Sequence, residues 1–91
     1  MRVTRSSQFK KDYKLAEKQH KNIPLLIDAI SKLSKQETLP DKLRDHKLSG
    51  IMRGYRELHL APDWLLIYKV DCEENELKLA RLGSHAQLFK K

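Results

Sequence analysis

The middle of the sequence places side chains of complementary chemistry around one predicted strand end. Arg56, His59, Asp63 and Trp64 occupy one short stretch, so a cation, an imidazole, a carboxylate and an indole could converge on one ligand. A loop ahead of this stretch can carry His46 over the same strand end. Because imidazoles exchange protons near cellular pH, we predict an active site here.

Two strands joined by a tight turn must position these side chains. From Tyr55 to Leu60 two sets of side chains alternate, with Glu57 and His59 on one face and Arg56 on the other. The apolar run that follows the turn Ala61-Pro62-Asp63 predicts a central strand, so the pair should form an antiparallel hairpin. The three predicted strands of this region are roughly Tyr55 to Leu60, Trp64 to Val70 and Glu76 to Leu82.

The flanking segments extend this predicted sheet. Alternation in the third strand puts Leu77, Leu79 and Arg81 on one face. The segment from Leu39 to Met52 lacks a sustained period and contains a proline and a glycine, so we expect an ordered loop. The extended segment Arg2-Val3-Thr4 could add an edge strand.

Two amphipathic helices precede the long strands. Ser6 or Ser7 can cap the first helix, whose apolar stripe lies opposite a lysine-rich face. Asn22 can cap the second helix, which must end before Pro40. Because only a few residues join them, we expect an antiparallel helix pair. The apolar stripes are Phe9, Tyr13, Leu15 and Ala16 in the first helix, and Ile23, Leu26, Ile27, Ile30 and Leu33 in the second.

The end of the chain adds one more short element. Ser84 can cap a terminal helical turn that puts His85 and Phe89 on one side, four residues apart. Helices followed by strands predict an α+β domain with two N-terminal helices packed on a small antiparallel sheet. The expected order is β-α-α-β-β-β, closed by the short C-terminal helical turn.

Size and charge narrow the classes of function. With 91 residues we expect a single domain spanning residues 1–91. Nineteen Lys and Arg against twelve Asp and Glu give a net charge of +7, which favours nucleic acid or an acidic protein as partner. No apolar run reaches the roughly 20 residues of a membrane span, so we expect a cytoplasmic protein without a membrane partner. The lone Cys72 has no internal disulfide partner and reads as a surface thiol in a hairpin turn.

Four short motifs follow one another along the second half of the chain. They are Asp45-His46-x-Leu48-x-Gly50, Gly54-Tyr55-Arg56-x-x-His59, Pro62-Asp63-Trp64-x-Leu66-x-Tyr68 and Arg81-x-Gly83-x-His85-x-x-Leu88-Phe89. Together with the order of helices and strands they resemble the YafQ branch of the RelE/ParE toxin superfamily, and the match covers nearly the whole chain. The resemblance implies a RelE-like fold, a compact sheet backed by two helices.

The resemblance also implies an activity and its partners. A toxin of this branch belongs to a type II toxin-antitoxin system, cleaves mRNA in the ribosomal A site and thereby inhibits translation. Its partners would be an acidic antitoxin, the ribosome with its mRNA, and operator DNA bound through the antitoxin complex. The implied endoribonuclease is an mRNA interferase that needs no cofactor and no metal.

The functional residues of the branch carry over to this chain without substitution. The implied catalytic residues are His46, His59, Asp63, Arg81 and His85, and the implied RNA-binding residues are Trp64 and Phe89, with Arg56 added as a further phosphate contact. The implied reaction is attack of the ribose 2′-hydroxyl on the adjacent phosphate, which leaves a 2′,3′-cyclic phosphate. Arg81 would offset charge on the phosphate and His85 would act as general acid. His46 or His59 would be the base, with Asp63 orienting an imidazole or sharing the base role.

Each assignment has a structural alternative. Trp64 opens a core strand and could simply be buried, and Arg56 could form an ion pair with the loop that carries Asp45. Three histidines and a carboxylate could instead ligate zinc in a metal hydrolase, although no HExxH or CxxC unit is present. A toxin without enzymatic activity that resembles the ParE branch, or a plain RNA-binding module, would need cations but no clustered histidines.

Overall fold

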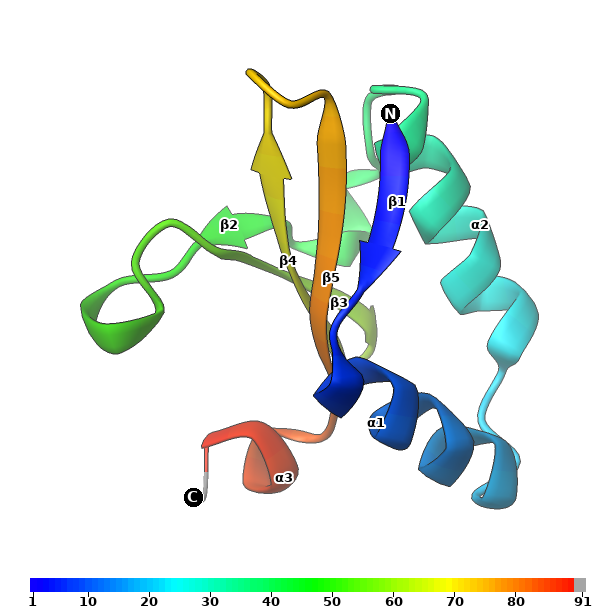
Figure 1. Cartoon of the computed structure of the whole chain (residues 1–91). Helices are drawn as coiled ribbons and strands as arrows, with labels where there is room; N and C mark the ends of the chain where they lie inside the picture. The colour runs from blue at the N-terminus through cyan, green and yellow to red at the C-terminus, as the bar shows by residue number, and fades with distance from the viewer. Residues whose placement is uncertain (90–91) are drawn as a thin grey trace.

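A five-stranded sheet forms the centre of the molecule in the computed structural model, which describes residues 1–89 (Figure 1). The strands are β1 Arg2–Arg5, β2 His46–Lys47, β3 Arg56–Ala61, β4 Trp64–Asp71 and β5 Glu76–Gly83, in the spatial order β1-β5-β4-β3-β2. The helices are α1 Ser7–Lys18, α2 Ile23–Ser34 and α3 His85–Phe89, with 3-10 turns at Asp41–Leu43 and Gly50–Met52. The predicted α+β class is confirmed. The terminal lysines that end the basic C-terminal segment, 90 and 91, lie outside the described residues.

The sheet differs from the expected antiparallel one in two strands. β1 pairs in parallel with β5, which makes the sheet mixed. Inside the segment expected to be a loop, the two residues of β2 pair antiparallel with β3 and place His46 opposite Glu57. A two-residue strand carries too short a pattern for alternation to reveal it. Within residues 1–89 no helix is long and apolar enough to cross a membrane.

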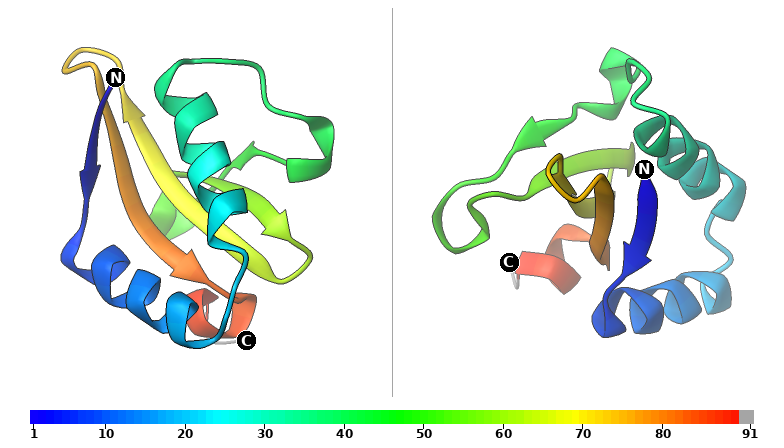
Figure 2. Two further views of the ribbon diagram at one scale, coloured as in Figure 1. Left: turned by 90° about the vertical axis from the view of Figure 1, so that its right-hand side faces the viewer. Right: turned by 45° about the horizontal axis from the view of Figure 1, so that its top comes forward.

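The two long helices begin at the predicted caps but do not form the expected antiparallel pair. The Ser6 hydroxyl accepts a hydrogen bond from the backbone N–H of Phe9 at 2.9 Å, and the Asn22 side chain accepts one from that of Leu25 at 3.3 Å. From their junction the helices diverge, α1 along the end of β5 and α2 across the sheet toward β3 (Figures 1 and 2). Each helix therefore buries its own stripe against the sheet instead of against the other helix.

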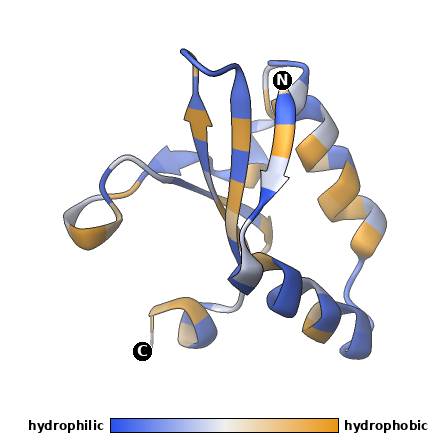
Figure 3. Cartoon of the chain, in the orientation of Figure 1, coloured by the Kyte–Doolittle hydropathy of each residue, from blue (hydrophilic) through white to orange (hydrophobic). Residues whose placement is uncertain are grey.

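The core lies between one face of the central strands and the two long helices, to which α1 contributes Phe9 and Ala16. In α2 the buried positions are Leu26 and Ala29, while Ile27, predicted to face the core, is 52% exposed. Figure 3 shows apolar residues along α2 and the central strands, and a mainly hydrophilic α1. The fully buried residues of the sheet include Leu58, Leu65, Leu66, Ile67, Tyr68, Leu77 and Leu79.

An irregularity in β5 decides which face Arg81 occupies. The pairing of β4 with β5 runs Tyr68 to Leu79 and then Ile67 to Arg81, so Ala80 is an extra residue on β5. Paired residues share a face of the sheet, and one extra residue turns the following side chains over. Arg81 therefore lies on the face opposite Leu79, which corrects the expectation that both would share one face.

Candidate active site

Three histidines from three elements lie in a row on the sheet face away from α2. His46 comes from β2, His59 from β3 and His85 from the start of α3. The ring centroids are 6.0 Å apart between His46 and His59, and 5.8 Å apart between His59 and His85. Strand pairing produces the first contact, because His46 lies opposite Glu57 and Glu57 shares its face with His59. The turn of chain after Gly83 brings His85 to the other side of His59.

The backbone fixes which nitrogen of His46 faces the site. Nδ1 lies 2.7 Å from the carbonyl oxygen of Arg44, a contact that requires a proton on Nδ1. Arg44 adopts the left-handed conformation with φ 52°, ending the 3-10 turn and giving its carbonyl this direction. Nε2 is left to exchange protons, and half of the imidazole is exposed. His46 is therefore anchored at one nitrogen and accessible at the other.

His85 is anchored in the same way, but by a carboxylate. Asp63, in the turn between β3 and β4, accepts hydrogen bonds at Oδ1 from the backbone N–H of His85 at 2.9 Å and from its Nδ1 at 2.7 Å. These two hydrogen bonds, the backbone one first, hold the pKa of Asp63 below its ordinary value. The ionised Asp63 can balance the charge of a protonated His85. Within residues 1–89 the Nε2 atom of His85 has no hydrogen-bond partner, and the side chain is 44% exposed.

His59 lies between the two exposed imidazoles and is itself buried. Its side chain is 11% exposed, and burial lowers the pKa of His59, an effect that the nearby Glu57 carboxylate partly opposes. Its Nδ1 has no hydrogen-bond partner among the described residues. His59 therefore favours the neutral form, with Nε2 directed at Glu57 Oε1 at 3.5 Å.

Glu57 is a site residue that the sequence interpretation did not select. Its side chain is 7% exposed, and its Oε1 lies 3.5 Å from Nε2 of His59 and 3.9 Å from Nε2 of His46. A buried carboxylate needs such partners to offset its desolvation. The alternation in β3 already put Glu57 on the face of His59, and that was the available signal.

Arg81 lies on the same face of the sheet as Glu57. It pairs with Ile67 of β4, and Ile67 pairs with Glu57 of β3. Its guanidinium binds Asp12 of α1, with Nε 2.8 Å from Oδ2 and Nη2 3.4 Å from Oδ1. Sequence interpretation missed Asp12 as well, although this aspartate falls between Phe9 and Ala16 on the apolar stripe of α1. A carboxylate within the apolar stripe of a helix indicates a buried charge that needs a partner, and this pattern could have identified Asp12.

The two predicted aromatic contacts of RNA have different environments. Trp64 is 3% exposed and packs within the core, so the expectation that it offers a stacking surface for a base is wrong. Trp64 is buried because it is the first residue of the central strand β4. Phe89 closes α3, with its ring 6.5 Å from the ring of His85, and it borders the site.

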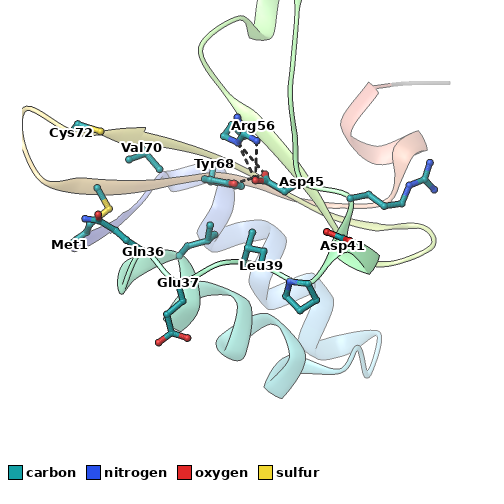
Figure 4. A pocket seen from close by; sticks show the side chains of 13 residues that line it. Met1, Gln36, Glu37, Leu39, Asp41, Asp45, Arg56, Tyr68, Val70 and Cys72 are labelled. Carbon is teal, nitrogen blue, oxygen red and sulfur yellow. Dashed lines mark hydrogen bonds and ion pairs between the residues drawn. The ribbon is translucent and has the colours of Figure 1, made fainter.

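Arg56 faces away from the histidines, and its predicted phosphate contact is not supported. Nε lies 3.2 Å from both carboxylate oxygens of Asp45, and Nη2 lies 3.0 Å from Oδ2, as Figure 4 shows. The Tyr68 hydroxyl donates to the same carboxylate at 2.5 Å. The contact with Asp45 raises the pKa of Arg56, while burial, followed by the Asp45 contact, raises that of Tyr68. Arg56 is thus the ion-pair partner of the Asp45 loop.

A cavity of about 470 Å³ opens beside this ion pair (Figure 4). Its lining comes from the end of α2, the following loop and the outer parts of β3 and β4, and includes Leu33, Leu39 and Val70. None of the lining residues is a histidine. The cavity is therefore separate from the row of imidazoles, of which those of His46 and His85 are exposed.

One group of side chains in the site could hold a metal ion. His46, Glu57 and His59 each offer one ligand atom, and these atoms lie within 4.8 Å of one another. Imidazole nitrogens with a carboxylate oxygen suit zinc or copper. The same nitrogens are the ones available for proton transfer, so a metal there would compete with acid-base chemistry.

Comparison with known proteins finds extensive similarity. The family model described as bacterial toxin of type II toxin-antitoxin system, YafQ, matches residues 1–90. The mRNA interferase toxin YafQ of Escherichia coli is 42% identical over 85 residues, covering 92% of this chain and 90% of that protein. The crystal structure of a metal-bound toxin from Helicobacter pylori superposes with a TM-score of 0.93 at 39% identity, covering 98% of this chain and 99% of that one. YafQ in the Escherichia coli DinJ-YafQ complex gives a TM-score of 0.88 at 41% identity with the same coverage.

Proposed function

Because the chain belongs to the YafQ family of bacterial toxins from type II toxin-antitoxin systems, we propose that it is an mRNA interferase. The reaction is cleavage of mRNA in the ribosomal A site, which inhibits translation. The observation that carries the proposal is the row of three imidazoles, in which the two exposed rings are anchored through Nδ1 and present Nε2. A protein that only bound RNA would have no use for two such groups.

His46 is the general base of the proposed reaction. Its Nε2 takes the proton of the ribose 2′-hydroxyl, because Nδ1 is committed to the Arg44 carbonyl. Glu57, 3.9 Å from Nε2, offsets the positive charge that His46 acquires. His59 lies between the base and the acid, and because burial lowers the pKa of His59 we assign it no proton in the reaction.

His85 is the general acid. Its Nδ1 contacts the Asp63 carboxylate directly, at 2.7 Å, whereas the carboxylate near His46 lies 3.9 Å from that imidazole. Coulomb attraction is stronger at the shorter distance, and we assign the acid role to the imidazole with the closer carboxylate on this geometric ground. Nε2 of His85 then gives its proton to the leaving 5′-oxygen, and the product carries a 2′,3′-cyclic phosphate.

Arg81 and Phe89 complete the proposed site. The guanidinium of Arg81 is permanently charged and stabilises the pentavalent phosphate formed during the attack. Phe89, beside His85, provides a surface on which a base of the mRNA stacks. Neither step needs a metal ion, because the charges and the proton carriers come from side chains.

The exposed surface supports the proposed partners. The lysines at positions 10, 11, 14 and 18 of α1 are exposed and form a basic face suited to ribosomal RNA. The chain carries a net charge of +7, which suits capture by an acidic antitoxin that folds on binding. The Escherichia coli relative is found in complex with DinJ. Such a complex would bind operator DNA through the antitoxin, and the free toxin would act in the cytoplasm, where ribosomes are.

The test is cleavage of mRNA on programmed ribosomes under single-turnover conditions, followed by analysis of the product ends. We expect cleavage in the A site and a 2′,3′-cyclic phosphate. In cells, induced expression without the antitoxin should stop incorporation of labelled amino acids, and a His46→Ala, His85→Ala double variant should not. Soluble wild-type protein that leaves both mRNA and translation intact would refute the proposed function.

A further inference from the structure

Asp12 is a nearly buried carboxylate that joins α1 to the catalytic face of the sheet. Its side chain is 9% exposed. Oδ2 accepts hydrogen bonds from Nε of Arg81 at 2.8 Å and from the backbone N–H of Leu82 at 2.9 Å. Oδ1 lies 3.4 Å from Nη2 of Arg81 and 3.2 Å from the amide nitrogen of Gln8. All four groups are hydrogen-bond donors, so each carboxylate oxygen of Asp12 has two hydrogen-bond partners.

The position of Asp12 follows from where β1 stops. β1 pairs with β5 as far as Arg5 and Leu79, and the chain then turns into α1. Beyond that point β5 continues to Gly83 without β1 beside it, so the backbone N–H of Leu82 lacks a strand partner. A buried N–H without a partner is costly, and Asp12 supplies the acceptor.

The same carboxylate fixes the direction of Arg81. The extra residue Ala80 in β5 turns Arg81 toward the catalytic face, but a long side chain there could adopt many rotamers. Contact of Asp12 with both Nε and Nη2 restricts the guanidinium to one plane. An arginine has five N–H donors, so about three remain for a phosphate, and the Arg81 side chain is still 30% exposed.

We propose that Asp12 is a positioning residue for RNA cleavage, which holds the Arg81 guanidinium in the orientation that meets the scissile phosphate. This inference rests on the proposed function, in particular on the role of Arg81 at the phosphate. A guanidinium that is already oriented loses little entropy when the phosphate binds, and it stabilises the transition state without rearrangement. α1 thus contributes to catalysis through the contact of Asp12 with Arg81.

Asp12→Asn is the substitution that separates orientation from folding. The amide oxygen can replace Oδ2 and keep the hydrogen bonds to Leu82 and to Nε of Arg81. The amide nitrogen then replaces Oδ1 and cannot accept from Nη2, so the guanidinium loses the second contact and the charge that holds it. A matched control is Asp28→Asn, which removes an exposed helical carboxylate paired with Lys32 at 3.0 Å.

The experiment measures single-turnover cleavage of programmed ribosomes over a range of toxin concentrations, for the wild type, Asp12→Asn, Arg81→Ala and the double variant. We expect Asp12→Asn to lower the maximal rate about tenfold, with less than about a twofold change in half-saturation. In the Arg81→Ala background Asp12→Asn should have no further effect, because the two residues act as one unit. Asp28→Asn should cleave at the wild-type rate.

The possible failures are distinguishable. If Arg81→Ala cleaves as fast as the wild type, the role of Arg81 in the proposed function is wrong, and the positioning role falls with it. If Arg81→Ala is slow and Asp12→Asn is fast, or if their effects add, the positioning role alone is overturned. Arg81→Lys keeps the charge and leaves Asp12 in contact with Leu82, so it tests orientation even if Asp12→Asn unfolds. We expect about the same tenfold loss, and a wild-type rate for Arg81→Lys would overturn the proposal.

Discussion

Replacing His85 by alanine should stop proton donation while leaving the fold intact. The His85 side chain is 44% exposed, and no residue of the five-residue helix α3 is buried. Removing the imidazole therefore removes no core contact. We expect a change in stability within about 0.5 kcal/mol, which is the usual range for surface positions. General acid catalysis contributes about 10² to 10⁴ in rate, so the cleavage step should slow by at least about a hundredfold. Ribosome binding should change little, because the phosphate contact proposed for Arg81 remains.

A milder substitution, at the carboxylate that anchors His85, tests the same role. In Asp63→Asn an amide oxygen can still accept the hydrogen bonds from the backbone N–H and from Nδ1, but the negative charge beside the imidazole is lost. We therefore expect an intermediate rate, reduced about tenfold, because the imidazole keeps its orientation but loses the neighbouring negative charge.

The assay for both variants is single-turnover cleavage of a programmed ribosome across a pH series, with thermal unfolding and ribosome binding as controls. Full cleavage by His85→Ala would remove this residue from the acid role. A rate for Asp63→Asn below that of His85→Ala would contradict the view that Asp63 acts through His85, and would assign the aspartate a direct part in the chemistry.

Three further outcomes are expected. Tyr68→Phe removes one donor from Asp45 and should cost about 1 kcal/mol in urea unfolding, without changing the cleavage rate. The pKa of His59 is lowered from 6.5, so the stability linked to this group is present above that pH and is lost as the pH falls through its folded pKa. Urea midpoints of the wild type should therefore drop between about pH 7 and about pH 5, and those of His59→Gln should drop less. A chelator should leave cleavage unchanged, whereas added zinc should inhibit it by occupying His46 and His59; loss of activity with chelator and recovery with zinc would favour the metal hydrolase instead.

The parts of the site that depend on strand alternation could be predicted from the sequence. The alternation of β3 placed His59 on one face and Arg56 on the other, and the turn at Pro62 and Asp63 is where it was expected. Alternation succeeds there because one face of β3 meets the core at Leu58 and the other does not. The alternative role of Arg56, an ion pair with the Asp45 loop, followed from the same pattern and is confirmed.

The parts that depend on irregular pairing could not be predicted. Nothing in the composition of β5 marks Ala80 as an extra residue, because a bulge is set by the tertiary fit of the strands. The carboxylate that meets Arg81 comes from Asp12, far away in the sequence, and no local pattern connects the two. Trp64 shows a different limit, since a motif match can assign a functional aromatic residue although the strand that carries it is buried.

The close packing of α3 explains how so short a helix can hold His85, the proposed general acid, in place. A Cβ atom at Gly83 would lie 2.9 Å from Oε1 of Gln87 and 3.3 Å from Cδ2 of Leu88, so glycine lets α3 approach the end of β5. The same Oε1 atom accepts the backbone N–H of Ser84 at 2.8 Å, and Asp63 accepts that of His85 at 2.9 Å. These two side chains satisfy N–H groups at the start of α3 that would otherwise lack acceptors. Because Asp63 also accepts from Nδ1 of His85, docking of the helix and orientation of the imidazole depend on one carboxylate, and the β3–β4 turn sets the position of the proposed general acid.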